Sequence, residues 1–227
     1  MKRILMAVVL LGVAGSAWAQ ATPAPPAPAA AQAYKPYDES KFYVAGMAGV
    51  TFGNKTSSLF GAEAGMKVGD ILEVFAEGGR MTDVTTSGTE AAAVALSTWL
   101  GTQGKGSATW TVKTPATYVA IGARYLFPMS GRFEPYAAMT VGLANVSKEA
   151  SFAVNGADVT GSLQSLNVQL GRDLDGKTNN ALLTLGGGVK MPFGPVIVDA
   201  GARYARIFTN PTGTNLIRLQ AAVGYRF

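Results

Sequence analysis

Eleven charged residues of this sequence each stand between apolar or small neighbours, a spacing that places side chains on one face of a β-strand. Six are basic and five are acidic. Charges on one face can line a passage and select among solutes, or they can pair with one another and fill the space. Their near balance argues against strong selection for ions of one sign. The residues are Glu63, Lys67, Glu73, Glu77, Arg124, Glu134, Lys190, Asp199, Arg203, Arg218 and Arg226.

The sequence contains no histidine and no cysteine. Histidine is the most frequent general base, the usual partner of a nucleophilic serine and the commonest metal ligand, so most hydrolytic and metal chemistry is excluded. The absence of cysteine removes disulfides and thiolate sites. A serine–lysine or carboxylate pair that works without histidine is conceivable, but nothing in the sequence isolates one. We therefore expect no enzyme, no catalytic residue, no cofactor and no metal site.

The strand that shows most clearly how such charges are positioned is the last one, residues 216–227. Counting back from Phe227, every second residue as far as Ile217 is apolar or aromatic, whereas the alternate positions are polar or small except at Leu216. About eleven residues at roughly 3.3 Å each, tilted by roughly 45°, cover about 25 Å, the height of the apolar band of a transmembrane barrel. The apolar face therefore has the length needed to meet lipid.

A similar alternation recurs along the chain and defines eight expected strands. Turns of two to five residues follow the second, fourth and sixth strands, whereas residues 85–115 and 148–179 form long connections on the other rim. The sequence therefore predicts an all-β fold, an eight-stranded antiparallel up-and-down transmembrane β-barrel whose termini lie on the short-turn side. The expected strands are 42–52, 58–68, 71–84, 116–127, 133–147, 180–193, 196–209 and 216–227; both faces of the first are apolar, so its facing stays open.

The two long connections differ in composition. In the first, residues 90–100 are helix-forming, and residues 107–113 look extended and are expected to prolong the next strand. Trp99 and Trp110 also lie there; they either contact a partner or pack within the loop and against the barrel rim. The second connection, 148–179, is expected to be a polar loop.

The eleven charged residues are expected to face the lumen, because an arginine or lysine facing lipid costs about 2–4 kcal/mol near the bilayer midplane. In a confined interior opposite charges should pair, since an unpaired buried charge is expensive. They then form either a selectivity lining or a salt-bridged plug, and the narrow space inside eight strands favours the plug. The Gly186–Gly188 run resembles no phosphate loop and is expected to relieve crowding inside the lumen.

Aromatic residues gather near the expected strand ends, as in the girdles at membrane interfaces. The expected girdle residues are Phe42, Phe52, Phe60, Tyr125, Phe127, Phe193, Tyr204, Phe208, Tyr225 and Phe227.

The amino-terminal segment has the pattern of an export signal. Lys2 and Arg3 precede an apolar run and the small-x-small site Ala17-Trp18-Ala19, which predicts a signal peptide over residues 1–19; an uncleaved anchor helix is the alternative. Residues 20–40 are expected to be a Pro/Ala-rich periplasmic linker, and residues 41–227 the barrel domain. Beyond Ala19 the chain has 17 basic and 14 acidic residues, a balance too mild to indicate nucleic acid.

Four motifs carry a resemblance to a known family: Phe42–Gly46, Gly122–Phe127, Glu134–Tyr136 and Val223–Phe227. Together with the export signal they resemble the small eight-stranded OmpA-type barrels of the outer membrane, a group that includes opacity and Omp25-like surface proteins. The resemblance implies that the terminal Phe227, with Tyr225, is an assembly signal read by the barrel assembly machinery. The histidine-dependent enzymes of similar fold offer no site that can be transferred here. Because the chain ends at Phe227, a peptidoglycan-binding domain like that of full-length OmpA is not expected.

Three functions remain to be compared. The first is a non-enzymatic barrel with structural and surface-interaction roles, exported to the bacterial outer membrane, where it contacts lipid and lipopolysaccharide and presents its long loops to a host or surface ligand. The second is a narrow pore for small solutes or ions. The third, a soluble carrier like a lipocalin, requires an apolar interior, which the alternation of Glu63 and Lys67 with Phe60 and Met66 contradicts.

Overall fold

The computed structural model describes residues 42–227, except 105, 130, 167–169, 172–173 and 211–212. The predicted signal peptide and linker lie outside the described residues. The described residues belong to one compact unit that spans 36–227. No helix within these residues is long and apolar enough to cross a membrane.

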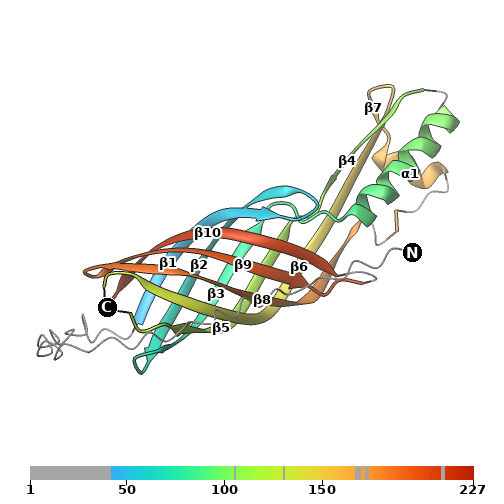
Figure 1. Ribbon diagram of the computed structural model, residues 1–227. Helices are drawn as coiled ribbons and strands as arrows, with labels where there is room; N and C mark the ends of the chain where they lie inside the picture. Colours follow the sequence, from blue (N-terminus) through green and yellow to red (C-terminus); the bar gives the residue numbers. More distant parts are fainter. Residues whose placement is uncertain (1–41, 105, 130, 167–169, 172–173, 211–212) are drawn as a thin grey trace, which may run out of the picture. The chain divides into compact units, whose positions relative to one another are not determined.

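Eight strands form a closed antiparallel barrel (Figure 1). Each strand pairs with the next in the ring, and β1 pairs with β10 through ten facing residue pairs, from Tyr43–Arg226 to Phe52–Ile217. This closure confirms the predicted fold. The strands are, in ring order, β1 (Phe42–Phe52), β2 (Thr56–Val68), β3 (Leu72–Met81), β5 (Ala116–Leu126), β6 (Glu134–Val154), β8 (Gly176–Phe193), β9 (Val196–Ile207) and β10 (Thr214–Arg226).

The two rims of the barrel differ in their connections. One rim, here called the turn rim, holds the connections 69–71, 127–133 and 194–195 together with the start of β1 and the end of β10. The opposite rim, the loop rim, holds the longer segments between β3 and β5 and between β6 and β8. The two long connections therefore lie on the same rim, as predicted, where they are joined by the shorter connections 53–55 and 208–213; on the turn rim, 127–133 is longer than the predicted two to five residues.

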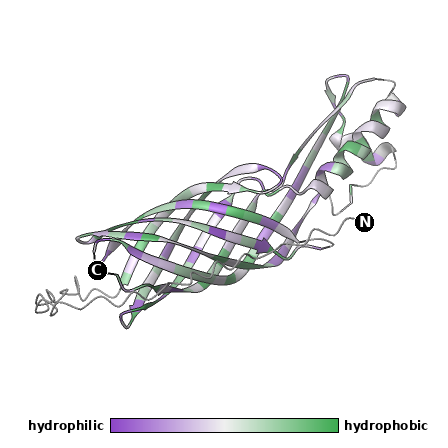
Figure 2. Ribbon diagram, in the orientation of Figure 1, coloured by the Kyte–Doolittle hydropathy of each residue, from purple (hydrophilic) through white to green (hydrophobic). Residues whose placement is uncertain are grey.

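Burial alternates residue by residue along the barrel strands, because successive side chains point to opposite faces. Figure 2 shows the resulting mixture of hydrophobic and hydrophilic positions along each strand. The facing of β1, which the sequence left open, is settled: Tyr43, Ala45 and Met47 point inward, and Phe42 and Val44 point outward.

Two apolar clusters fill the interior on either side of the charged residues. The loop-side core includes Leu59, Met81 and Leu216, each at most 3% exposed. The turn-side core includes Tyr43 and Phe75. Leu216 belongs to the strand face that was predicted to be polar, and its burial shows that this face becomes apolar near the loop rim.

The segment beyond the loop rim is folded, which corrects the expectation of a polar loop over 148–179. β6 continues to Val154 and β8 already begins at Gly176, so both ends of that segment are strand. β4 (Ala108–Lys113) pairs with residues 149–154 of β6 and, as predicted, continues the line of β5 along β6. The break between them falls at Thr114 and Pro115, where proline has no N–H to donate.

We call this folded extension the platform: the described residues of 87–113 and 149–174. It adds helix α1 (Ser87–Gly104), strand β7 (Ala157–Asp158) and the 3₁₀ helix η1 (Thr160–Leu166) to the β4–β6 ladder (Figure 1). Its own apolar core consists of Ala93, Leu100, Val112, Phe152, Leu163 and Leu174. A separate core indicates a preformed structure rather than a flexible loop.

Candidate functional site

The charged residues of the lumen are arranged in like-charged neighbours along the sheet. Glu63 of β2 faces Glu77 of β3 in the strand register, and Arg203 of β9 faces Arg218 of β10. Like charges directly opposite each other destabilise a strand pair. Each pair therefore needs a partner from elsewhere in the barrel.

The partner lies across the lumen, because β3 and β9 are four places apart in the ring of eight. Glu77 accepts a hydrogen bond from Arg203 Nη1 at 2.6 Å and one from Arg218 Nη1 at 3.2 Å. The second Arg203 nitrogen, Nη2, lies 3.7 Å from the Glu63 carboxylate. The carboxylate pair and the guanidinium pair thus neutralise each other across the barrel and tie opposite walls together.

Arg124 of β5 is the centre of a second set of contacts. Its Nη2 lies 2.6 Å from Glu63 Oε2, and its Nη1 lies 2.7 Å from both Glu73 Oε1 and the Tyr43 hydroxyl. The guanidinium also stacks 4.2 Å from the centre of the Phe75 ring, in cation–π geometry. Arg124 is fully buried, so these contacts take the place of its hydration.

Lys190 and Asp199 complete the charged layer from β8 and β9. The Lys190 ammonium donates to both oxygens of Glu73, at 2.6 and 2.7 Å, and lies 4.1 Å from the centre of the Tyr43 ring. Asp199 accepts a hydrogen bond from the Tyr136 hydroxyl at 2.8 Å. Four cations and four carboxylates therefore share one buried network, here called the lumen network: Arg124, Lys190, Arg203, Arg218, Glu63, Glu73, Glu77 and Asp199.

Three of the eleven predicted lumen residues lie outside this network, toward the turn rim. Arg226 is buried, but its Nη2 is 4.0 Å from Glu134, which is only partly buried. Lys67 is also partly buried, and it faces Glu73 in the strand register. The structure thus brings together eight of the eleven and leaves Lys67, Glu134 and Arg226 as a looser group near the rim.

Sequence reasoning did not include the tyrosines of the lumen among the site residues. Tyr43 contacts Arg124, Tyr118 accepts a hydrogen bond from Arg218 Nη2 at 2.6 Å, and Tyr136 donates to Asp199. Tyr118 and Tyr136 share strand parity with the charges, which was the signal that could have identified them.

A glycine makes room for at least one of these rings. A Cβ built on Gly188 would stand 2.6 Å from the Tyr136 hydroxyl, so a larger residue would displace the tyrosine. This close approach agrees with the expectation that the Gly186–Gly188 run relieves crowding inside the lumen.

The interior of the barrel is filled by paired charges and by apolar side chains. The lumen network is buried between the loop-side and turn-side cores. No group of three or more carboxylates in the described part of the chain is arranged to hold a metal ion. Of the two arrangements weighed from the sequence, this geometry favours the salt-bridged plug over a selectivity lining.

The predicted girdle aromatics all point outward from the barrel. The ten residues are between 40% and 63% exposed, and Phe133, which was not predicted, is 60% exposed. Tyr125 and Phe127 stack edge to face, with ring centroids 5.1 Å apart. Tyr225 and Phe227 are among the exposed residues, and the Phe227 amide donates to the Phe42 carbonyl at 2.9 Å across the closing seam.

The two tryptophans of the platform have different environments. Trp110 of β4 is partly buried and packs against the platform core. Trp99 of α1 is 39% exposed and shares an outer face of the helix with Val94, which is 47% exposed, and with Ala91 and Ala95. Residues spaced four apart lie on the same side of a helix, so Ala91, Ala95 and Trp99 form one apolar stripe, here called the α1 stripe, with Val94 at its edge three residues after Ala91.

Polar contacts fix the platform at its ends. Glu90, in the first turn of α1, forms an ion pair with Lys55 at 3.2 Å and accepts a hydrogen bond from Asn54 at 2.7 Å, which ties the helix to the β1–β2 turn. A carboxylate in the first turn also suits the positive end of the helix dipole. At the far end, hydrogen bonds from Thr160 hold the pKa of the exposed Asp158 carboxyl below its usual value.

Comparison with known proteins agrees with this geometry. A family model described as Outer membrane protein beta-barrel domain matches residues 6–227. The crystal structure of Neisserial surface protein A is similar, with a TM-score of 0.52 and 17% identity over 82% of this chain and 97% of that one. The N-terminal β-barrel domain of Pseudomonas aeruginosa OprF has a TM-score of 0.50 and 14% identity, covering 83% and 98% of the two chains. At these identities the likeness concerns the fold; no curated protein matches the chain by sequence.

Proposed function

Because the chain belongs to the outer membrane protein beta-barrel domain family and is located in the bacterial outer membrane, we propose that it is a non-enzymatic surface-interaction protein. The barrel anchors the chain and contributes to the structure of the membrane, while the platform presents a binding surface outside the cell. In this orientation the turn rim faces the periplasm.

The observation that carries the proposal is the contrast between a filled interior and a folded exterior. The lumen network and the two apolar cores occupy the barrel, and this filling supports an anchor rather than an enzyme or a pore. The platform, in contrast, has its own core and exposes Val94 and Trp99. The name of the similar Neisserial protein, a surface protein, is in keeping with this role.

A narrow pore for small solutes or ions is the alternative. It would require the loop-side core to part, because Leu59 and Met81 are fully buried there. It would also require cross-lumen pairs such as Glu77–Arg203 to separate, and breaking a buried ion pair is costly. The anchored surface protein is therefore the better account of the interior.

The chemistry of each exposed surface indicates the binding partner that it would contact. The exposed apolar belt of the barrel contacts outer-membrane lipid and lipopolysaccharide, and the carboxy-terminal strand with Tyr225 and Phe227 is the segment that engages the barrel assembly machinery. The exposed α1 stripe is suited to a protein ligand on a host or neighbouring surface, because tryptophan is enriched at binding hot spots. The charge pattern provides no basic cluster for nucleic acid.

Removal of the platform should abolish surface binding and leave the barrel folded. The Val84 amide donates to the Thr114 carbonyl at 2.8 Å, and Lys148 faces Gly176 in the strand register, so an Asn-Gly turn can replace residues 86–113 and another can replace residues 149–175. Cells displaying the intact protein or the shortened variant are compared for adherence to a monolayer of cultured host epithelial cells. Heat-modifiable migration in electrophoresis reports whether the barrel is folded.

Point variants test whether binding depends on the α1 stripe specifically or on any exposed aromatic side chain. Trp99→Ala should lower adherence by about tenfold or more, as expected for loss of a central aromatic contact. Phe133→Ala, at an even more exposed aromatic of the turn rim, should leave adherence unchanged. Equal adherence of cells with the intact protein and cells with the shortened variant would contradict the proposed surface role.

A further inference from the structure

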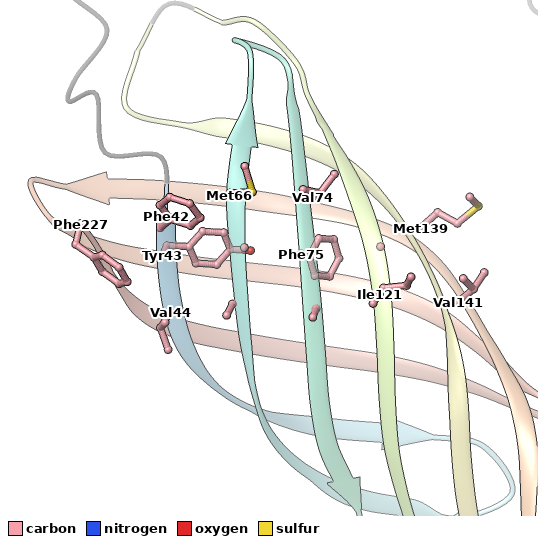
Figure 3. A pocket seen from close by; sticks show the side chains of 14 residues that line it. Phe42, Tyr43, Val44, Met66, Val74, Phe75, Ile121, Met139, Val141 and Phe227 are labelled. Atoms are coloured by element: carbon pink, nitrogen blue, oxygen red, sulfur yellow. The ribbon is translucent and has the colours of Figure 1, made fainter.

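The outer wall of the barrel is hollowed near the turn rim. A hollow of about 680 Å³ lies over β1, β2, β3, β5 and the neighbouring part of β6, and a second of about 710 Å³ adjoins it toward the loop rim. The two share Val44, Ala64, Ala76, Ile121 and Val141 among their lining residues. Figure 3 shows the first hollow, with Phe42 and Phe227 at one end and Ile121 and Val141 at the other. We call the two together the wall groove.

The wall groove arises from a difference in side-chain size between neighbouring strands. Its floor consists of outward-facing small residues in register: Ala64 faces Ala76, and Ala62 faces Gly78. Its walls are larger residues on the flanking strands, Val44 of β1 and Ile121 of β5, which are 50% and 66% exposed.

The wall groove is lined by apolar side chains and therefore suits a hydrocarbon ligand. The side chains that project into it are apolar; Glu63 and Glu77, which border the second hollow, point into the lumen and are each 3% exposed. The groove is continuous with the exposed apolar belt of the barrel, which faces the bilayer. No polar headgroup can be satisfied on its floor, whereas an acyl chain buries its methylenes there.

The walls of the wall groove suit a single acyl chain. Three strand spacings of about 4.8 Å separate β1 from β5, so Val44 and Ile121 stand about 14 Å apart between backbones and closer between their side chains. One acyl chain is narrow enough to lie along the floor between them. The end lined by Phe42 and Phe227 lies at the turn rim, at the level where a headgroup would sit.

We propose that the wall groove holds one acyl chain of a glycerophospholipid from the periplasmic leaflet as a persistent ligand. The choice of leaflet rests on the orientation given under the proposed function. The ligand is a phospholipid, because the periplasmic leaflet of the outer membrane lacks lipopolysaccharide. Its chain fills a hollow that packing of the protein leaves open.

The test compares a filled groove with a matched change on the opposite wall. In Ala64→Leu with Ala76→Leu, two larger side chains occupy the floor. In the control, Ala200→Leu with Ala202→Leu, the same change is made at outward-facing, exposed positions of β9. Each protein is extracted from membranes in mild detergent, checked for heat-modifiable migration and analysed by native mass spectrometry for bound lipid.

The intact protein and the control should retain one phospholipid, and the filled variant should retain about tenfold less, because its groove no longer desolvates the chain. Equal retention by the filled variant and the control would overturn the proposal. So would a two-chain species that is lost only in the filled variant, since the groove would then join copies of the protein. If the filled variant does not fold, the intact protein is titrated with phosphatidylethanolamine instead. Binding that saturates at one phospholipid per protein supports the proposal, and binding that does not saturate overturns it.

The same spectra separate this inference from the proposed function. Retained lipid A in place of phospholipid would overturn both the choice of leaflet and the proposed orientation. Retained phospholipid with no adherence by the platform would overturn only the surface role.

Discussion

Replacing Arg124 with methionine should lower the free energy of unfolding by about 3–5 kcal/mol, because removal of one partner leaves a buried charge uncompensated. The carboxylate most affected is Glu63, which loses its 2.6 Å contact with Arg124 and keeps the neutral Tyr43 hydroxyl at 3.2 Å and the more distant Arg203 Nη2 at 3.7 Å. Glu73 loses less, since Lys190 still binds both of its oxygens. Urea unfolding in phospholipid vesicles measures the change.

Two further variants test whether the loss comes from the ion pair itself. Arg80→Met removes an exposed arginine of β3 and should change the stability by no more than about 0.5 kcal/mol. Adding Glu63→Gln to Arg124→Met should restore part of the loss, with a coupling of about 1–3 kcal/mol between the two substitutions. Additive effects of the two would show that Glu63 and Arg124 do not depend on each other in the folded barrel.

Phe152→Ala should unfold or loosen the platform while the barrel keeps its stability. Phe152 is 1% exposed in the platform core, and truncation of a buried phenylalanine costs about 3–5 kcal/mol. Trp99 and Trp110 are the only tryptophans after residue 19, so tryptophan fluorescence of the processed chain reports the platform alone. Heat-modifiable migration reports the barrel in the same samples.

The control for this prediction is Phe133→Ala, which truncates an exposed phenylalanine outside the platform core. It should leave the fluorescence transition of the platform in place. If Phe152→Ala instead shifts the fluorescence and migration transitions together, the platform and barrel form one cooperative unit and the platform is not an independent structure.

Local patterns in the sequence were sufficient for the barrel. The alternation around Glu63 and Lys67 identified the inward face of β2, because a two-residue period translates directly into two faces of a sheet. Where both faces of a strand are apolar, as in β1, the two-residue period does not indicate which face points inward. There the structure is decided by Tyr43, whose hydroxyl contacts Arg124 inside the lumen.

The partners inside the lumen could not be predicted in the same way. Glu77 pairs with Arg203 and Arg218, which lie more than one hundred residues later in the chain and on the opposite wall. Such contacts depend on the closure and stagger of the whole ring, which no local pattern reports.

The helix over 90–100 and the extended segment 107–113 were predicted and are α1 and β4, but the second half of the platform was missed for a related reason. Residues 148–154 are mixed in polarity because the strand they form lies beyond the membrane belt, where no alternation between lipid and lumen is imposed. Their pairing with β4 depends on a segment more than thirty residues away. The composition of 148–179 therefore favoured a loop where the structure has a strand.

Single-channel recording on the refolded chain in planar bilayers tests most directly whether the barrel is a sealed anchor. The buried lumen network and the loop-side core predict no steady conductance for the intact protein, with or without the platform. A steady, reproducible conductance from folded, heat-modifiable protein would contradict the sealed interior and favour the pore.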